Sequence, residues 1–238
     1  MYAINHAATA LVINKRYPSV PLFALLVAVQ FVEVLWVVLN VLGIEHTTLV
    51  GGLTRLSDMP WSHSVATLLG YSVAAWLILA VGFGRRVLGT AIGLGIGSHL
   101  VLDLATHLPD IQLAPGIDSI RLGSGLYSQP LLAFAFESIY GVACWRVFGG
   151  SWRLLAVIVL NNLINLPLLF AAGSSPDPNG ASAPTNPLAV SVVALEIVIT
   201  WLLVWFFARS DRAAAAGGRR PARHSAWGFL TVHPLAQR

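Results

Sequence analysis

Six apolar runs determine what this chain can fold into. A helix that crosses a bilayer needs about 20 predominantly apolar residues, and the runs cover residues 20–42, 64–83, 87–108, 130–148, 152–172 and 187–208. Only 10% of the residues are charged, whereas a typical soluble domain has about 25%. We therefore predict an all-α fold, a polytopic membrane helix bundle of about six transmembrane helices that forms one domain over residues 1–208.

Lys and Arg residues alternate between the two ends of the predicted helices. One set of loops and termini contains Lys15, Arg16, Arg85, Arg86, Arg146, Arg153 and the tail from Arg209 onward, whereas the intervening loops hold only Arg55 and Arg121. By the positive-inside rule, the first set is cytoplasmic. We predict a multi-pass protein of the bacterial inner (plasma) membrane with a cytoplasmic C-terminus. Residues 209–238 are predicted to be a disordered, Arg-rich cytoplasmic tail.

The cysteine and charge content narrows the function classes. Because Cys144 is the single cysteine, an intramolecular disulfide and a Cys-rich metal site are excluded. The formal net charge is +4, and most of the Arg excess lies in the tail beside the last predicted helix. Arg residues in that position indicate that the tail is attracted to anionic lipid. The expected partners are membrane lipid and a small-molecule or lipid substrate, and no nucleic acid.

Two histidines and an aspartate recur every four residues in the third run. Residues four apart share one face of a helix, so His99, Asp103 and His107 form a polar stripe, which Asp110 would extend if the helix continued that far. Counting about 1.5 Å per residue from Arg86 places Asp103 roughly 26 Å along the helix, in the outer half of a membrane core about 30 Å thick. An ionised Asp inside a membrane costs about 2.5 to 3.5 kcal/mol, so the stripe indicates a functional site. The alternative is a water-filled groove or helix-to-helix hydrogen bonding.

Three further carboxylates and two asparagines are predicted to lie within the membrane: Glu33, Glu137, Glu196, Asn161 and Asn165. Together with the aspartate of the stripe, these carboxylates would cost on the order of 10 kcal/mol if they were ionised and unpaired. Some of them must therefore be paired, protonated or bound to a cation. We expect the asparagines to form hydrogen bonds between helices rather than to line a site.

Imidazole nitrogens and carboxylate oxygens are natural ligands of Zn²⁺ and similar divalent ions. His63 stands at the outer entrance of the second run, which a short turn joins to the third, so these runs are antiparallel neighbours. A cluster of His63, His99, Asp103 and His107, with Glu33 opposite, could then hold a divalent metal, and we predict Zn. Such an ion would lower the pKa of a bound water towards neutrality. Paired histidines could instead bind haem.

Residues 1–13 are apolar but too short to cross a membrane. If Lys15 and Arg16 mark a turn at the inner face, this segment could be a half-helix packed against the first span, which would bring His6 towards the depth of Glu33. The alternative is an interfacial helix with His6 in contact with cytoplasmic water.

Four segments together resemble a known family. They are Asn5-His6, Gln30-Phe31-Val32-Glu33, Met59-Pro60-Trp61-Ser62-His63-Ser64 and Ser98-His99-Leu100-Val101-Leu102-Asp103. This combination resembles the predicted membrane-bound metal-dependent hydrolases that include the YdjM-like proteins, over roughly residues 1 to 110. The resemblance implies that the metal ligands or metal-site acid/base groups are His6, Glu33, His63, His99 and Asp103. The chain departs from the family pattern at Trp61-Ser62, at Glu33, where an Asp is usual, and at Leu35, where a second Asp is usual.

The predicted function is membrane-embedded, metal-dependent hydrolysis. Asp103, His99 and His63 are the expected ligands, and Glu33 and His107 are the expected catalytic residues, Glu33 as a ligand or general base. The substrate would be reached from the membrane plane or the outer side, and a lipid head-group ester is one example. A cation- or proton-coupled transporter that uses the same residues is the main alternative, followed by a non-catalytic membrane subunit.

Overall fold

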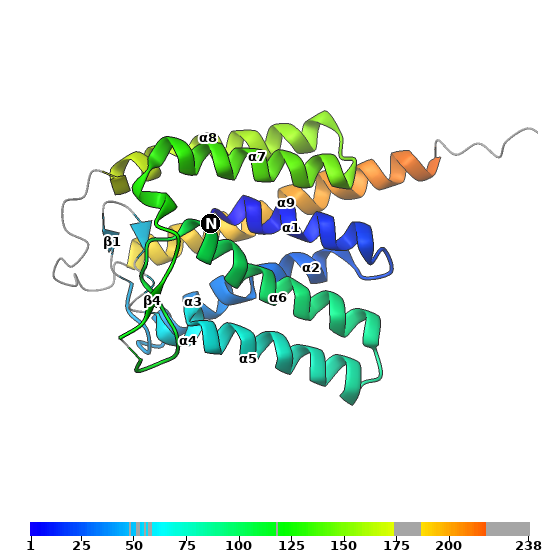
Figure 1. Cartoon of the computed structure of the whole chain (residues 1–238). Coiled ribbons are helices and arrows are strands. Elements are labelled where there is room, and N and C mark those ends of the chain that lie inside the picture. The colour runs from blue at the N-terminus through cyan, green and yellow to red at the C-terminus, as the bar shows by residue number, and fades with distance from the viewer. Residues whose placement is uncertain are drawn as a thin grey trace, which may run out of the picture.

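The computed structural model of this chain is a bundle of helices with short loops and two small hairpins at one end (Figure 1). It describes residues 1–47, 49–50, 53–54, 56, 59–117, 119–173 and 187–217. Five helical segments are long and apolar enough to cross a membrane: Val65–Gly82, Arg86–Thr106, Pro130–Phe148, Trp152–Phe170 and Val190–Asp211. A bent pair, Leu22–Val29 and Phe31–Val41, can form a sixth crossing. The predicted all-α bundle is confirmed, and its five to six apolar helices are those of a multi-pass membrane protein.

The long helices pack as antiparallel neighbours. The spans are α5 (Val65–Trp76) with its π-helical continuation η2 (Leu77–Gly82), α6 (Arg86–Thr106), α7 (Pro130–Phe148), α8 (Trp152–Gly173) and α9 (Pro187–Gly217). α5 packs against α6 and α7 against α8, as the short turns between these runs predict. Large apolar side chains such as Leu69, Val73 and Val81 are exposed on the outside, where a membrane would cover them.

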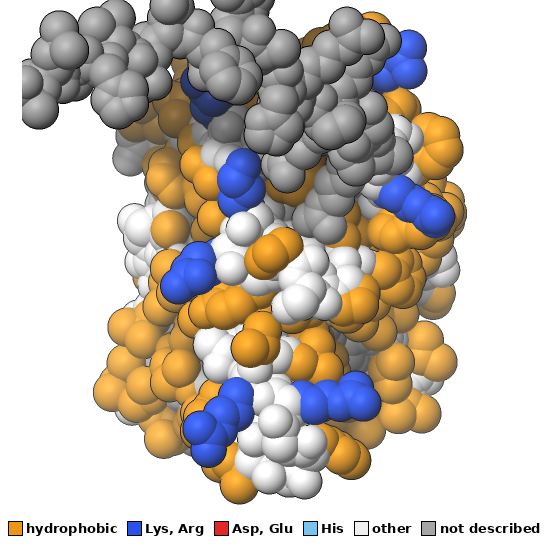
Figure 2. All heavy atoms as spheres, turned by 90° about the vertical axis from the view of Figure 1, so that its right-hand side faces the viewer, with side chains coloured by type: hydrophobic (Ala, Val, Ile, Leu, Met, Phe, Trp, Pro, Cys, Tyr) orange, Lys and Arg blue, Asp and Glu red, His pale blue; other side chains and the backbone are white. Residues whose placement is uncertain are grey.

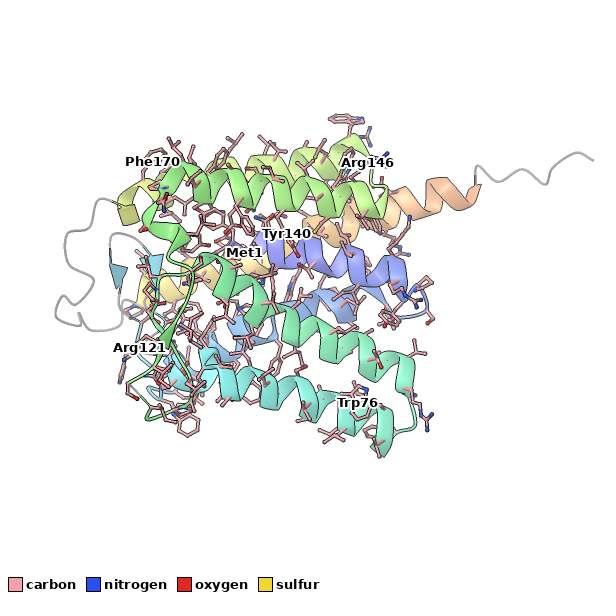
Figure 3. The ribbon with its side chains drawn as sticks, in the orientation of Figure 1. Met1, Trp76, Arg121, Tyr140, Arg146 and Phe170 are labelled. Carbon is pink, nitrogen blue, oxygen red and sulfur yellow. The ribbon has the colours of Figure 1, made fainter. Side chains whose placement is uncertain are left out.

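Short elements fill the end of the bundle at which the hairpins lie, here called the loop end. They are α4 (Pro60–His63), the 3₁₀ turn η3 (Leu126–Ser128) and two antiparallel hairpins, in which β1 (Leu49–Val50) pairs with β2 (Leu53–Thr54) and β3 (Ile111–Gln112) pairs with β4 (Arg121–Leu122). Arg121 marks this end in Figure 3, and Arg146 lies towards the opposite end.

The opposite end, here called the basic end, gathers the Lys and Arg side chains on which the topology prediction depends. They come from the end of α1 (Ala3–Arg16), from the turn before α6, from the turn between α7 and α8, and from α9. Figure 2 looks onto this end, where Lys and Arg side chains stand out on a face that is otherwise apolar or neutral. The alternation of basic loops found in the sequence is therefore a real asymmetry of the folded bundle.

The short helix α1 lies in the centre of the bundle, between the α5–α6 pair and the α7–α8 pair (Figure 1). Its residues Ile4, Ala7, Ala8 and Leu11 are fully buried. Small alanine side chains allow α2, α6, α7 and α9 to approach this helix from several directions. Of the two predictions for residues 1–13, the packed half-helix is confirmed and the interfacial helix is wrong, because His6 has no exposed surface.

The first predicted span is broken. α2 (Leu22–Val29) and α3 (Phe31–Val41) meet at Gln30 at an angle of 55°. The buried Gln30 side chain donates from Nε2 to the carbonyl oxygen of Ala3, at 2.6 Å, and so ties the break to α1. The span predicted over residues 20–42 is therefore a bent pair of helices, which together can still form one crossing.

Glycines on two faces of α6 allow it to approach both neighbouring helices. A Cβ at Gly95 would lie 2.9 Å from the Cβ of Ala28 on α2, and a Cβ at Gly93 would lie 3.2 Å from the carbonyl oxygen of Ser72 on α5. His99 stands one turn beyond Gly95, so this contact places it beside the break between α2 and α3. The functional side chains are therefore positioned by close backbone packing.

The C-terminal end of α9 overlaps the tail that was predicted to be disordered. The helix continues to Gly217, so residues 209–217 are helical, and the expectation of disorder from residue 209 is wrong for these nine positions. An apolar helix extends most readily through the Ala-rich stretch that follows Arg212. The rest of the predicted tail, 218–238, lies outside the described residues.

Candidate metal centre

His99 and Asp103 form the middle of the candidate site. Both are buried on α6, one turn apart, and His99 Nε2 lies 3.1 Å from Asp103 Oδ2. This contact lacks the geometry of a hydrogen bond, and Nε2 of His99 has no hydrogen-bond partner in the described part of the structure. A buried imidazole nitrogen that faces a carboxylate without bonding to it is an atom available for another ligand.

His6 enters the same space from α1. Its ring stacks on that of His99, with centroids 3.9 Å apart and the planes 7° from parallel. Nε2 of His6 lies 3.6 Å from Asp103 Oδ1, and neither ring nitrogen of His6 has a hydrogen-bond partner among the described residues. The central position of α1 therefore supplies a second unpartnered imidazole.

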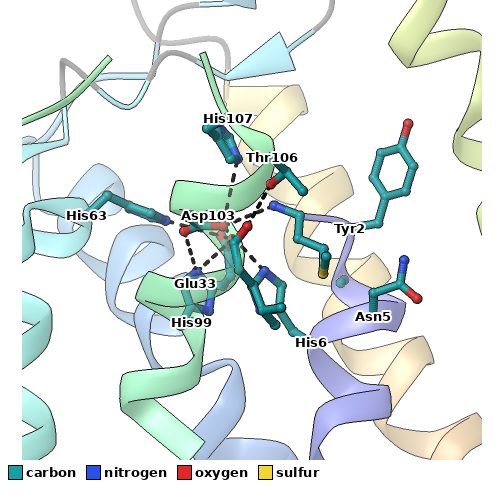
Figure 4. Close-up of polar contacts among 12 residues, drawn as sticks. Tyr2, Asn5, His6, Glu33, His63, His99, Asp103, Thr106 and His107 are labelled. Carbon is teal, nitrogen blue, oxygen red and sulfur yellow. Dashed lines mark hydrogen bonds and ion pairs between the residues drawn. The ribbon is translucent and has the colours of Figure 1, made fainter. Parts of the chain in front are cut away.

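Glu33 and His63 close the site from the side of α3 and α4, as Figure 4 shows. Glu33 Oε1 lies 3.6 Å from His99 Nε2 and 3.8 Å from His63 Nε2. Glu33 is three residues after the break in the first span, and the change of direction there points α3 along this side of α6. Five side chains from four helices thus converge on one space.

The spacing of these donor atoms fits a metal ion. Two groups, His6 with His99 and Asp103, and Glu33 with His63 and His99, each offer three ligand atoms within 4.8 Å of one another. Two atoms bound at about 2.1 Å to one tetrahedral Zn²⁺ are about 3.4 Å apart, and the contacts at 3.1, 3.6 and 3.6 Å around Asp103 and His99 lie near that value. The buried group could therefore hold a metal ion.

Outer contacts fix which nitrogen of each imidazole faces the centre. His99 Nδ1 donates to the carbonyl oxygen of Val29 at 3.0 Å, the last residue before the break, so Nε2 carries the lone pair of the neutral ring. His63 Nδ1 lies 2.7 Å from Ser62 Oγ, which itself donates to Glu45 Oε2 at 2.7 Å. Ser62 therefore accepts from His63 Nδ1, and His63 Nε2 faces Glu33. In nearly all metal-binding histidines, the ring nitrogen that does not face the metal forms a hydrogen bond of this kind.

Sequence reasoning missed Glu45 and gave Ser62 no role. Glu45 is buried and also accepts from the backbone N–H groups of Trp61 and Ser62, at 2.7 and 2.8 Å, so it caps α4. Its position in a loop, 18 residues before His63, carries no periodic pattern. No local pattern marks it, because an acidic residue that favours a helix N-terminus is expected within the first turn, and Glu45 lies 15 residues before Pro60, where α4 begins.

His107 lies at the edge of the cluster. α6 ends at Thr106, and the extended backbone of His107 places its Nε2 3.9 Å from Asp103 Oδ1, outside both ligand groups. The three side chains of the predicted stripe therefore do lie together, with His107 beside Asp103 but outside the ligand groups. The idea that Asp110 extends it is wrong, because the helix has ended and Asp110 Oδ2 accepts from Leu56 N instead. Asp103 Oδ1 also accepts from the amino group of Met1, at 3.0 Å.

Glu137 belongs to a different cluster, on the other side of α1. It accepts hydrogen bonds from Asn5 Nδ2, from the hydroxyl of Tyr127 at 2.8 Å, and from the backbone of Tyr2. Burial and the negative charge of Glu137 raise the pKa of Tyr127 well above its usual range, so this phenol stays protonated and keeps donating. Asn162 accepts from Asn5 at 2.9 Å. These contacts hold α1 in place.

Asn161, Asn165 and Glu196 form a third polar group, between α8 and α9. Asn165 Nδ2 donates to Glu196 Oε1 at 3.0 Å and to Asn161 Oδ1 at 3.1 Å. The expected hydrogen bonding between helices is present, but Asn165 and Glu196 also line a cavity of about 120 Å³ with Glu33, His63 and His107. Asn165 therefore forms a hydrogen bond between helices, as expected, and it also lines a site, which was the less favoured prediction for the asparagines.

The chain matches no protein-family model, no curated protein and no solved structure. The similarity to membrane-bound metal-dependent hydrolases therefore depends on the four quoted segments alone.

Proposed function

We propose that this protein is a membrane-embedded, metal-dependent hydrolase whose ligands are His6, His99 and Asp103, completed by Glu33 and His63. The observation that carries the proposal is the convergence of imidazole nitrogens that lack hydrogen-bond partners on two carboxylates. A catalytic Zn²⁺ binds three nitrogen or oxygen ligands from the protein and one water, so not all five side chains need to bind it, and Glu33 can act as a general base instead. When bound, the ion would supply Lewis acidity and an activated water.

The side chains around the cluster have separate roles in this proposal. Glu33 is the most exposed of the five, with 20% of its side chain accessible, and it lines the cavity, so it is placed to accept a proton from water. His107 lines the same cavity without belonging to a ligand group, so it is placed to give a proton to a leaving group. Ser62 and Glu45 hold His63 in the required tautomer.

The substrate in this proposal is an ester or phosphoester of a membrane lipid. Apolar side chains, among them Trp36, Leu168 and Ile197, line the cavity beside the polar ones. The cluster lies near the loop end of the bundle, and the basic end would face the cytoplasm by the positive-inside rule. The site would then work in the outer half of a bacterial inner membrane, with the C-terminus cytoplasmic.

The deciding experiment measures metal and turnover on the same purified chain. Elemental analysis should find about one equivalent of a divalent metal in the wild type and far less in Asp103→Ala and His63→Ala. His107→Ala should keep its metal and lose about 10²-fold or more in hydrolysis of short-chain phospholipids. Full metal content in Asp103→Ala would refute the site, and a loaded protein that hydrolyses no ester or phosphoester would refute the reaction.

Transport remains the second candidate because of one observation, the broken first span. Transporters use discontinuous helices whose backbone groups at the break bind ions or side chains, and here the carbonyl of Val29, at the break, accepts from the side chain of His99. If the protein is a transporter, we expect it to contain no bound transition metal. We also expect Asp103→Asn to change the pH dependence of solute uptake into proteoliposomes. A metal-loaded chain with no uptake would exclude it.

A further inference from the structure

The cavity beside the candidate metal centre has a second polar wall. Glu33, His63 and His107 line one side, and Asn165 of α8 and Glu196 of α9 line the other. The cavity volume of about 120 Å³ is well below the roughly 300–1,000 Å³ that takes up a drug-sized ligand. It is therefore of a size for a polar head group, with the apolar part of an amphiphile left outside.

The Asn165 side chain is held firmly. Its Nδ2 lies 3.1 Å from both Oδ1 and the backbone oxygen of Asn161 and 3.0 Å from Glu196 Oε1, while its own backbone oxygen accepts from the hydroxyl of Tyr2 at 2.7 Å. Side chains fixed in this way hold Glu196 at the cavity wall. A carboxylate built into a wall by three helices is a defined binding group, unlike a mobile surface acid.

Glu196 has no cationic partner among the described residues. It accepts a hydrogen bond from the neutral amide of Asn165, and no Lys or Arg is among the described residues that line the cavity. Met1 also lines the cavity, but its amino group pairs with Asp103 at 3.0 Å. An ionised carboxylate within a membrane span is costly, and a cation from a ligand would offset that cost. The aromatic rings of Tyr2, Trp36 and Tyr127 line the same cavity, and aromatic faces attract ammonium groups.

We infer that the wall formed by Asn165 and Glu196 binds the ammonium group of an amine-bearing phospholipid head group. The ammonium donates to Glu196, and the phosphoester of the same head group then extends across the cavity towards Glu33 and His63. The role of this wall as a substrate subsite depends on the proposed function, whereas its preference for a cation depends only on Glu196. An anionic head group without an amine has no cation to place against Glu196.

The test compares two soluble short-chain lipids that differ in the head group. Dihexanoyl phosphatidylethanolamine and dihexanoyl phosphatidylglycerol are titrated calorimetrically into the full chain in neutral maltoside micelles, with EDTA present so that no metal contributes. The wild type should bind the ethanolamine lipid about tenfold more tightly, the lower end of what a close charge pair gives. Glu196→Gln should abolish this preference, and Asn165→Ala should weaken it.

Asp211→Asn is the matched control, because Asp211 is a carboxylate on the same helix α9 at the basic end, where it accepts from Ser151 N. It should keep the preference. Equal binding of the two lipids by the wild type, or a preference that survives in Glu196→Gln, would overturn the inference. Metal content measured on the same preparations separates the two proposals: a metal-loaded chain without the preference refutes the ammonium wall alone, and a metal-free chain that shows the preference refutes the hydrolase alone.

Discussion

Two buried carboxylates on opposite sides of α1 have opposite surroundings. Glu137 is surrounded by donors: an amide, a phenol and a backbone N–H all point at its oxygens. Asp103 Oδ1 accepts from the amino group of Met1 at 3.0 Å, but the imidazoles beside it, those of His6 and His99, leave Nε2 without a hydrogen-bond partner in the described structure. The polar groups around Glu137 donate hydrogen bonds to it, whereas these two imidazoles form none with Asp103.

This difference shows how to distinguish a structural carboxylate from a site. Burial alone does not, because both groups are almost fully buried. What differs is whether the polar atoms are paired, since a fold can leave a buried nitrogen unpaired only at a cost of about 1–3 kcal/mol each. The Glu137 cluster should therefore contribute to the stability of the chain, and the Asp103 cluster should contribute to metal binding.

The largest expected effect is the loss of metal from Asp103→Asn. About four ligands share the roughly 10–16 kcal/mol with which proteins bind structural Zn²⁺, so removing one should lower the affinity on the order of a hundredfold to several hundredfold. Competition with a chromogenic chelator measures this. Asp211→Asn, which removes a carboxylate at the basic end, should bind metal as the wild type does.

Glu137→Ala should show the converse pattern. It leaves the phenol of Tyr127, the amide of Asn5 and the backbone N–H of Tyr2 without their acceptor, at about 1 kcal/mol each within a membrane. The expected loss is about 3 kcal/mol in the free energy of unfolding, read from thermal unfolding in detergent. Glu137→Gln retains an acceptor oxygen and should lose less. If Glu137→Ala instead lost metal with no change in stability, the distinction between the two clusters would be wrong.

The sequence predicted the fold and part of the site because both depend on local patterns. Apolar runs of the length of a bilayer specify the spans, and the spacing of four between His99 and Asp103 puts them on one face of α6 whatever surrounds it. The pairing of α5 with α6 then brings His63 within reach. The central place of α1 was one of two open alternatives, since an apolar helix of this length suits a bundle interior and a membrane surface equally well.

The break at Gln30 and the contacts outside the ligands could not be predicted in this way. No Pro or Gly interrupts the first run at that point; instead, tertiary contacts stabilise the break, from Gln30 to Ala3 and from His99 to Val29. The hydrogen bonds of Glu45 depend likewise on how a loop folds back over α4. A single sequence contains no pattern from which long-range contacts of this kind can be predicted.

A smaller effect should follow from Ser62→Ala, which interrupts the contact between His63 and Glu45. Loss of an outer contact of this kind typically lowers metal affinity 10- to 100-fold, because the imidazole can then adopt the wrong tautomer or rotate. The chelator competition measures this, and Ser62→Thr, which keeps the hydroxyl, should restore affinity. Ser64→Ala is the matched control, since the hydroxyl of Ser64 caps α5 by bonding to Thr67. An unchanged affinity in Ser62→Ala would remove His63 from the ligand set.

Asn162→Ala should have the smallest effect and tests whether α1 couples the two clusters. It removes the hydrogen bond at 2.9 Å from Asn5 to Asn162, while Asn5 keeps its bond to Glu137. Hydrogen bonds between membrane helices contribute about 0.6 kcal/mol on average. The free energy of unfolding, read from thermal unfolding, should therefore fall by about that amount. His6 follows Asn5 directly on α1, and if the Glu137 cluster only anchors the helix, metal affinity should stay the same. A loss of metal affinity in Asn162→Ala would mean that the hydrogen bonds of Asn5 also orient His6, and the two clusters would then act as one unit joined through the first turns of α1.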